Sequence, residues 1–335
     1  MKSILLRLVL PLAALAFVAP AASFAQKGKN DSGSSPSSPV VIPGGNVTET
    51  YVISTSGSYV LGGNRVMGDG AKHVIVISAA DVTLDLAGHT LSYASGVTGG
   101  GYAINVPLAV NVEIRNGSIA RTPHVAIGSL EHSGSGLRVI DLRLSDTGGI
   151  HSYGQNTHIE RCAVFDTSVY AAIYLGGNGG SVINCQVRDV PDGIGIYVQG
   201  GSRVVGNTVF NTKLGGIYVS AASSQSGSLV LENSVQSANN SRMALAAGIQ
   251  VHGTAIQVRN NAIGYAGTFG IWCDGTGNLV EGNVVGKTRF DTANVRGHGI
   301  LSSSDTNVVR NNCGAENSGE FLSGSYTNGG GNFGN

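Results

Sequence analysis

Short apolar strands recur along the chain at a nearly constant interval. A phrase in which Gly or Ala precedes Ile returns every 23 residues, at Ile104, Ile127, Ile150, Ile173 and Ile196. It continues with gaps of 21, 32, 22 and 29 residues at Ile217, Ile249, Ile271 and Ile300. A fixed period in this range, carried by strand formers and interrupted by Gly, Asn and Asp, is typical of a repeat architecture. The uneven gaps predict loops inserted into some of the repeats.

Each repeat contains two or three segments of three to five residues in which Val, Ile or Leu alternate with polar residues, separated by Gly-rich corners. Strands this short, recurring in the same order, must pair with the equivalent strand of the next repeat, which gives parallel sheets. The alternation places one face of each strand inside and the other in water. The pattern therefore predicts an all-β solenoid of about ten coils over residues 73–318.

A second column of equivalent residues stands just before the last strand of successive repeats. Its members are Cys162, Cys185, Asn207, Asn233, Asn261, Asn283 and Asn312. Stacked Asn side chains at an inward corner can pass amide hydrogen bonds from one coil to the next. The alternative is that Asn is used here only because it suits turn geometry.

Two cysteines of this column are candidates for a disulfide. Cys162 and Cys185 are 23 residues apart, which predicts neighbouring coils about 4.8 Å apart, within reach of a bridge. The alternative is two reduced, buried thiols that fill a position of the column. Cys273 and Cys313 fall in different columns, so no pairing is predicted for them.

The ends of the chain differ from the repeats. Residues 1–25 predict a secretory signal peptide, because a basic start and an apolar run precede small residues up to Ala25. Residues 26–45 are rich in Gly, Ser and Pro and predict a flexible linker. Residues 46–72 are expected to form an N-terminal cap with the first coil, and residues 319–335 a polar tail or cap. The expected product is secreted, extracellular or periplasmic, after cleavage near Ala25.

The composition excludes some classes of binding partner. Gly accounts for 51 of the 335 residues, only 12% are charged, and the formal net charge is +0. Nucleic acids and anionic membrane surfaces require a basic stripe, so neither is an expected partner. No apolar run after the signal peptide is long enough to cross a bilayer, so membrane insertion is not expected. A monomer is expected.

The repeated Gly-Ile-x-Val and Val-x-x-Asn-x-Val phrases, with DVTLDLAGHTL at residues 81–91, resemble the right-handed parallel β-helix repeat proteins of the pectin-lyase-like superfamily. The resemblance covers residues 73–318 and implies a right-handed parallel β-helix with an N-terminal cap. This superfamily includes polysaccharide lyases, glycoside hydrolases, epimerases, adhesins and non-catalytic binding modules. The resemblance therefore implies a fold and not one activity.

The residue after each repeated Ile is expected to point outward. In this column lie His151, Tyr174, Tyr197, Tyr218 and Trp272, which we interpret as candidate substrate-binding residues. Rings at the spacing of the coils form a rigid platform with stacking faces and polar edges, which suits a polysaccharide. The alternative is that the rings stack only to stabilise the sheet.

Three carboxylates also fall in register. Asp146, Asp166 and Asp189 occupy equivalent corners of successive repeats, where like charges repel unless a cation lies between them. They are candidate metal ligands, with Ca²⁺ as the expected ion, or an acid/base pair for glycoside hydrolysis. The alternative is ordinary Asx turns, which favour Asp and Asn at such corners.

Five residues are candidates for catalysis. His252 and Asp274 are expected on neighbouring coils beside Trp272, where the carboxylate could orient the imidazole for proton transfer. Inserted loops carry Arg242, Arg296 and His298 toward the same edge. The Gly-His-Gly phrase around His298 is similar to a polygalacturonase motif whose His lies at the active site, but the paired Asp-Asp and Arg-x-Lys motifs of that family are missing here.

The leading hypothesis for function is action on an extracellular, acidic polysaccharide by lyase or glycoside hydrolase chemistry. A lyase would need a base to remove the proton beside a uronate carboxylate, and a cation to neutralise that carboxylate. The alternative hypothesis is a non-catalytic surface or matrix module that binds glycan or protein.

Overall fold

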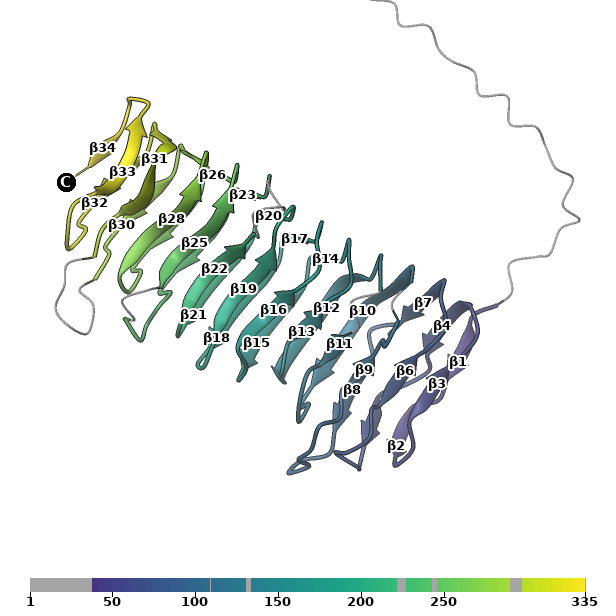
Figure 1. Cartoon of the computed structure of the whole chain (residues 1–335). Helices are drawn as coiled ribbons and strands as arrows, with labels where there is room; N and C mark the ends of the chain where they lie inside the picture. The colour runs from purple at the N-terminus through teal and green to yellow at the C-terminus, as the bar shows by residue number, and fades with distance from the viewer. Residues whose placement is uncertain are drawn as a thin grey trace, which may run out of the picture. The chain divides into compact units, whose positions relative to one another are not determined.

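From Ser38 onward, the described residues fold into one long coil of short parallel strands (Figure 1). The computed structural model describes residues 38–108, 110–130, 134–221, 227–242, 246–289 and 297–334. Every strand pairing in these ranges is parallel, and these ranges contain no helix. The predicted signal peptide and most of the predicted linker lie outside the described residues. No helix in the described ranges is long and apolar enough to cross a membrane.

Each coil contributes one strand to each of three parallel ladders, which form the three faces of the solenoid. The first sheet contains β1 (Val40–Ile42), β4 (Gly57–Leu61), β7 (Val82–Asp85), β10 (Val112–Ala120), β12 (Arg138–Thr147), β14 (His158–Glu160), β17 (Ser181–Ile183), β20 (Arg203–Val205), β23 (Leu229–Leu231), β26 (Gln257–Arg259) and β29 (Leu279–Glu281). The second sheet contains β2 (Gly45–Val47), β5 (Arg65–Met67), β8 (Thr90–Tyr93), β15 (Ala163–Thr167), β18 (Gln186–Val190), β21 (Thr208–Thr212), β24 (Ser234–Gln236), β27 (Ala262–Gly264), β30 (Val284–Gly286), β32 (Cys313–Ala315) and β34 (Phe333–Gly334). The third sheet contains β3 (Tyr51–Ile53), β6 (Ile75–Ile77), β9 (Ile104–Asn105), β11 (Ile127–Ser129), β13 (Ile150–Ser152), β16 (Ala171–Leu175), β19 (Ile194–Gln199), β22 (Gly215–Ser220), β25 (Ala247–Thr254), β28 (Phe269–Thr276), β31 (Ile300–Arg310) and β33 (Leu322–Asn328). Strands β10 and β12 also run on into the second sheet, and β31 runs on into the first.

The solenoid has about twelve coils, so the expected number of ten was too low. The additional coils lie at the two ends. Strands β1, β2 and β3 pair in parallel with β4, β5 and β6, although none of them carries the Gly-Ile phrase. At the other end, β33 and β34 continue the winding beyond residue 318. A search for one recurring phrase misses coils that keep the alternation of apolar residues but not the phrase.

The repeated isoleucines form the core. None of the nine, from Ile104 to Ile300, is more than 1% exposed, and each is in register with the next along the third sheet. Burying one isoleucine side chain contributes about 1.5–3 kcal/mol relative to leaving it exposed. The core is therefore a stripe of stacked apolar side chains that fixes which residues of each coil face outward.

The predicted asparagine column is a hydrogen-bonded ladder. The side-chain amide of Asn207 donates to Oδ1 of Asn233 at 3.0 Å, Asn233 to Asn261 at 2.9 Å, and Asn261 to Asn283 at 2.9 Å. Each of these oxygens also accepts the backbone N–H of the preceding Asn in the column. All of these side chains are buried. The ladder satisfies polar groups that turn geometry alone would leave unpaired.

Cys162 and Cys185 are buried free thiols in this structure. Hydrogen bonding to Cys185 and burial raise the pKa of Cys162. The backbone N–H of Cys185 donates to Oδ1 of Asn207 at 2.8 Å, so the cysteines lead into the ladder. Of the two interpretations of the pair, the structure favours reduced side chains that fill the column. Cys273 is also buried and free, and Cys313 is exposed and free.

Candidate functional site

Three tyrosines on consecutive coils form a continuous ring surface on the third sheet. Tyr174, Tyr197 and Tyr218, which we call the aromatic track, are direct partners in the ladder of β16, β19 and β22. Their ring centroids are 4.8 Å apart between Tyr174 and Tyr197 and 5.1 Å apart between Tyr197 and Tyr218. All three rings are half-buried, so one part of each packs on the sheet and the other faces solvent.

The other two members of the predicted column lie at the ends of this track. His151 pairs in register with Tyr174, with ring centroids 5.7 Å apart. Trp272 lies two coils beyond Tyr218, because Gln250 occupies the coil between them. The ring contact of Trp272 is with Phe269, at 5.8 Å. The column is therefore in register over its whole length, but its aromatic surface is interrupted at Gln250.

His151 is held in the neutral form. Its Nε2 lies 2.8 Å from the backbone oxygen of Ala171, so this nitrogen carries the proton and donates. Burial lowers the pKa of His151 below its usual range. Burial also lowers the pKa of His73, which contacts Tyr102 near the N-terminal end of the same sheet.

The depressed pKa of His151 makes stability depend on pH. In the unfolded chain the imidazole takes up a proton below about pH 6.5, whereas the folded chain resists protonation, so the free energy of unfolding should fall as pH drops below about 6.5. His151→Gln is expected to reduce this slope, because Gln keeps a donor for Ala171 but does not titrate. Urea unfolding at about pH 7.5 and about pH 5 measures the effect. An unchanged slope in the variant would contradict a buried neutral imidazole.

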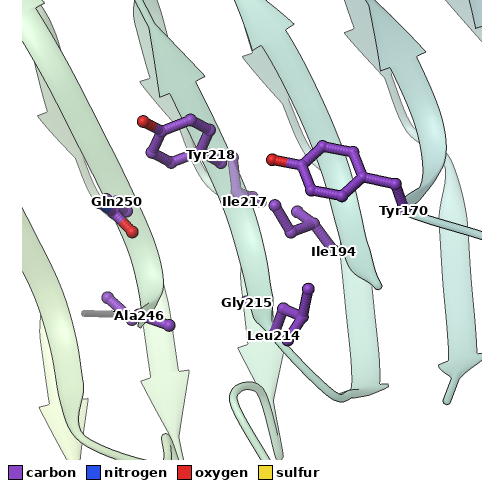
Figure 2. Close-up of a pocket in the computed structure, with 9 residues that line it drawn as sticks. Tyr170, Ile194, Leu214, Gly215, Ile217, Tyr218, Ala246 and Gln250 are labelled. Atoms are coloured by element: carbon purple, nitrogen blue, oxygen red, sulfur yellow. The ribbon is translucent and has the colours of Figure 1, made fainter. Parts of the chain in front are cut away.

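A pocket of about 240 Å³ opens beside the aromatic track (Figure 2). Figure 2 shows Tyr170 and Tyr218 along one side and Leu214 and Ala246 along the other, with Gln250 on the neighbouring strand. The described residues that line it are Tyr170, Ile194, Leu214, Gly215, Ile217, Tyr218, Ala246, Ala247 and Gln250. None of these side chains is charged.

Two small residues create this pocket. Equivalent positions of successive coils hold Ile194, Gly215, Ala247 and Phe269. Gly215 has no side chain, and Ala247 has only a methyl group, so a hollow remains between the larger Ile194 and Phe269. A Cβ atom added at Gly215 would lie 3.3 Å from the backbone oxygen of Ala247. Any larger side chain at position 215 would therefore extend into the hollow.

His252 and Asp274 meet as the sequence predicted. Nδ1 of His252 lies 2.7 Å from Oδ2 of Asp274, and the two residues are partners in the ladder of β25 and β28. Ser303 donates to the other carboxylate oxygen at 2.6 Å. The hydrogen bond from Ser303, followed by the contact with His252, lowers the pKa of Asp274. An ionised Asp274 accepts the proton of Nδ1, which leaves Nε2 of the exposed imidazole as a base.

The remaining catalytic candidates lie elsewhere. His298 contacts Phe269, with parallel rings 6.2 Å apart, at the start of β28, whereas Asp274 is near the end of that strand. Five residues of extended chain separate these positions by about 16 Å. Arg242 lies at an exposed corner before β25. Arg296 is outside the described residues. The structure therefore brings together His252 and Asp274 and separates His298 from both.

The acidic column lies at left-handed corners of the chain. Asp146, Asp166 and Asp189 have φ angles of 54°, 52° and 56°, a region that Asp and Asn tolerate better than other side chains. Oδ1 of Asp189 accepts a hydrogen bond from the Asn211 amide at 2.6 Å. Within the described ranges no group of three or more His, Cys, Asp or Glu residues could hold a metal ion. The geometry favours Asx corners over a Ca²⁺ site.

Substitution at Asp166 separates these two interpretations. Asp166→Asn should leave the melting temperature nearly unchanged, whereas Asp166→Val should cost about 1–2 kcal/mol, because a β-branched residue is strained at this φ. Thermal unfolding of both variants, with Ca²⁺ and with a chelator, measures this. A Ca²⁺-dependent rise in melting temperature that Asp166→Asn removes would instead establish a calcium site.

Comparison with known families agrees with this geometry. Residues 125–285 match the family model described as a right handed beta helix region. The chain therefore has a parallel β-helix fold. No curated protein matches it in sequence.

Solved structures share this β-helix fold. One is the catalytic domain of a mutant GH87 alpha-1,3-glucanase in complex with tetrasaccharides, with a TM-score of 0.57, 12% identity, and coverage of 88% of this chain and 64% of that one. Another is a mutant tailspike protein of E. coli bacteriophage HK620 in complex with a pentasaccharide, with a TM-score of 0.59, 12% identity, and coverage of 86% and 60%. The β-helix protein therefore spans less than two thirds of each of these chains. Identities this low show a common fold.

Sequence reasoning missed the pocket, the Tyr170 ring that lines it, and the contact that Tyr153 makes with the aromatic track. Tyr170 belongs to the corner before β16, outside the repeated phrase, and its ring lies 6.0 Å from that of Tyr197. Tyr153 contacts Tyr174 at 5.2 Å from the next outward position of β13's coil. The available signal was the pair of small residues, Gly215 and Ala247, at a position that is large on both neighbouring coils.

Proposed function

We propose that this β-helix protein is exported and binds an extended extracellular polysaccharide along the aromatic track. The observation that carries this proposal is the row of three tyrosine rings, 4.8 and 5.1 Å apart, on one solvent-facing sheet. Tyr174 and Tyr197 are stacked on each other with an interplanar angle of 15°, so these two rings turn their edges outward. A rung spacing of about 4.8 Å is comparable to the length of one sugar unit, so successive sugars can pack against successive ring edges. The bound oligosaccharides of the glucanase and the tailspike protein, which share the fold, support a glycan as the ligand.

A second candidate function is polysaccharide cleavage, and the contact between His252 and Asp274 favours it. The described geometry gives Asp274 a histidine as its close partner rather than a second carboxylate, and hydrolysis of glycosides normally needs two carboxyl groups. Elimination needs one base and a cation beside the uronate carboxylate, and Nε2 of His252 can act as the base that removes the proton beside that carboxylate. The glycosidic bond then breaks as a carbon–carbon double bond forms, and the departing sugar oxygen takes a proton from water. Lyase chemistry is thus the better match among the catalytic alternatives.

A panel of neutral and acidic polysaccharides tests both candidates. Affinity electrophoresis of the mature protein should show retardation by at least one polymer. Incubation with uronate polymers should release unsaturated products that absorb in the ultraviolet if His252 is a base, and His252→Ala should abolish them while retardation persists. Retardation without unsaturated products would support the binding function and exclude the lyase function for the polymers tested. Absence of retardation across the panel would overturn the binding proposal. The N-terminal residue of the exported protein, expected to be Gln26, tests the signal peptide.

A further inference from the structure

We propose that the pocket beside the aromatic track is a subsite that selects a sugar carrying an acetamido group. This inference rests on the proposed function and names the substrate class. The pocket begins where the track ends. Tyr218 and Gln250 are ladder partners on β22 and β25, and both line the pocket. A sugar stacked on Tyr218 therefore has its neighbouring substituent within reach of the pocket.

The lining excludes charged substituents. The walls at Ile194, Leu214 and Ala246 are apolar, and no charged side chain is present. A uronate carboxylate or an ammonium group would lose its hydration here without gaining an ionic partner, which is unfavourable. A methyl group is favoured in the same place, because it removes apolar surface from water.

Gln250 supplies the polar part of the recognition. Its side-chain amide is half-buried at the pocket edge and has no hydrogen-bond partner within the described ranges. An amide has both a donor and an acceptor, so it can pair with the C=O and the N–H of an acetamido group at once. An O-acetyl ester has no N–H, and the methyl group of a 6-deoxy sugar has no polar atom. Only the acetamido group uses both the apolar walls and both functions of Gln250.

The size of the pocket agrees with one sugar substituent. Its volume of about 240 Å³ is below the range of about 300–1,000 Å³ that is usual for drug-sized ligands. Tyr170, which is 56% exposed, stands at its outer side. The pocket therefore holds one substituted unit of a polymer, while the track holds the units before it.

The test compares glycans that differ in one group. A glycan array first pairs each N-acetylhexosamine oligomer with the hexose oligomer of the same linkage and length. The affinity of the oligomers that bind is then measured by titration calorimetry. The array also contains O-acetylated and 6-deoxy oligomers. The wild-type protein should bind the best acetamido oligomer about tenfold more tightly than its hexose match, which is about 1.4 kcal/mol. Gln250→Leu should reduce this ratio to about twofold or less. Gln236→Leu, the same change on β24 of the second sheet, is the control and should leave the ratio unchanged.

The outcomes separate this inference from the proposed function. Equal binding of matched oligomers, with loss of both in Tyr197→Ala, would overturn the acetamido subsite and leave the aromatic track as a binding surface. Preference for the O-acetylated or 6-deoxy oligomers would also overturn it. A preference that Gln250→Leu does not change would place selectivity outside the pocket. No binding to any oligomer, in a protein with the melting temperature of the wild type, would remove the proposed function together with the subsite.

Discussion

Asn261→Ala is expected to destabilise the protein by about 3 kcal/mol or more, because it opens the middle of the asparagine ladder. The Asn261 oxygen accepts the backbone N–H and the amide of Asn233, each at 2.9 Å. Its own amide donates to the backbone oxygen of Val230 and to Oδ1 of Asn283, also at 2.9 Å. The substitution removes all four hydrogen bonds from a buried place. Oδ1 of Asn283 keeps the backbone N–H of residue 261, and the Asn233 amide keeps the backbone oxygen of Val204. The backbone N–H of Asn233 loses its acceptor, and a buried polar group left unpaired costs about 1–3 kcal/mol before relaxation, in addition to the lost hydrogen bonds. Urea unfolding measures the loss.

Asn240 provides the matched control. It is exposed, and its amide makes one hydrogen bond, to Oδ1 of Asn211 at 2.6 Å. Asn240→Ala should therefore cost less than about 1 kcal/mol, since water can replace the lost partner. Similar losses in the two variants would mean that the ladder adds nothing beyond ordinary turn hydrogen bonds.

Tyr197→Ala is expected to weaken polysaccharide binding about tenfold or more, because Tyr197 is the middle ring of the aromatic track. Its removal leaves Tyr174 and Tyr218 without the ring between them and breaks the continuous row of ring edges. Loss of the apolar area that this ring would bury against the polymer is expected to cost about 1.4 kcal/mol, which corresponds to about tenfold weaker binding. Titration of the retained polymer against both proteins measures the change.

Two further variants show whether the ring itself is responsible. Tyr197→Phe keeps the aromatic ring and should retain most of the affinity. Phe210→Ala removes a ring that is 45% exposed on β21 of the second sheet and should leave binding unchanged. If Tyr197→Ala lowers the melting temperature sharply while the remaining folded protein binds with wild-type affinity, the rings serve the sheet and not a ligand.

The register of the solenoid could be predicted from the sequence because it depends on residue types that recur in every coil. The buried isoleucines and the asparagines recur once per coil, so aligning them also aligns the outward residues between them. The partnership of Tyr174 with Tyr197, and of His252 with Asp274, follows from that alignment.

The pocket could not be predicted in the same way, because it depends on what Gly215 and Ala247 lack. A hollow forms only where a small residue lies between large ones on adjacent coils, and Tyr170 closes it from a corner outside the repeated phrase. The separation of His298 from His252 was also missed. Aligning the repeats shows on which coil a residue lies. Whether two residues share a site also depends on how far apart they lie along the strand direction.

The asparagine ladder allows the length of the solenoid to change by whole coils. Each asparagine donates in the same direction, to the coil that follows, so a coil inserted or removed as a whole leaves every remaining bond with an equivalent partner. Each such coil also adds or removes one outward ring position on the third sheet. If the aromatic track binds glycan as proposed, the span that it holds grows in steps of one sugar per coil. Duplication of a segment such as residues 194–214, which carries both Tyr197 and Asn207, would then lengthen the track and extend the asparagine ladder together.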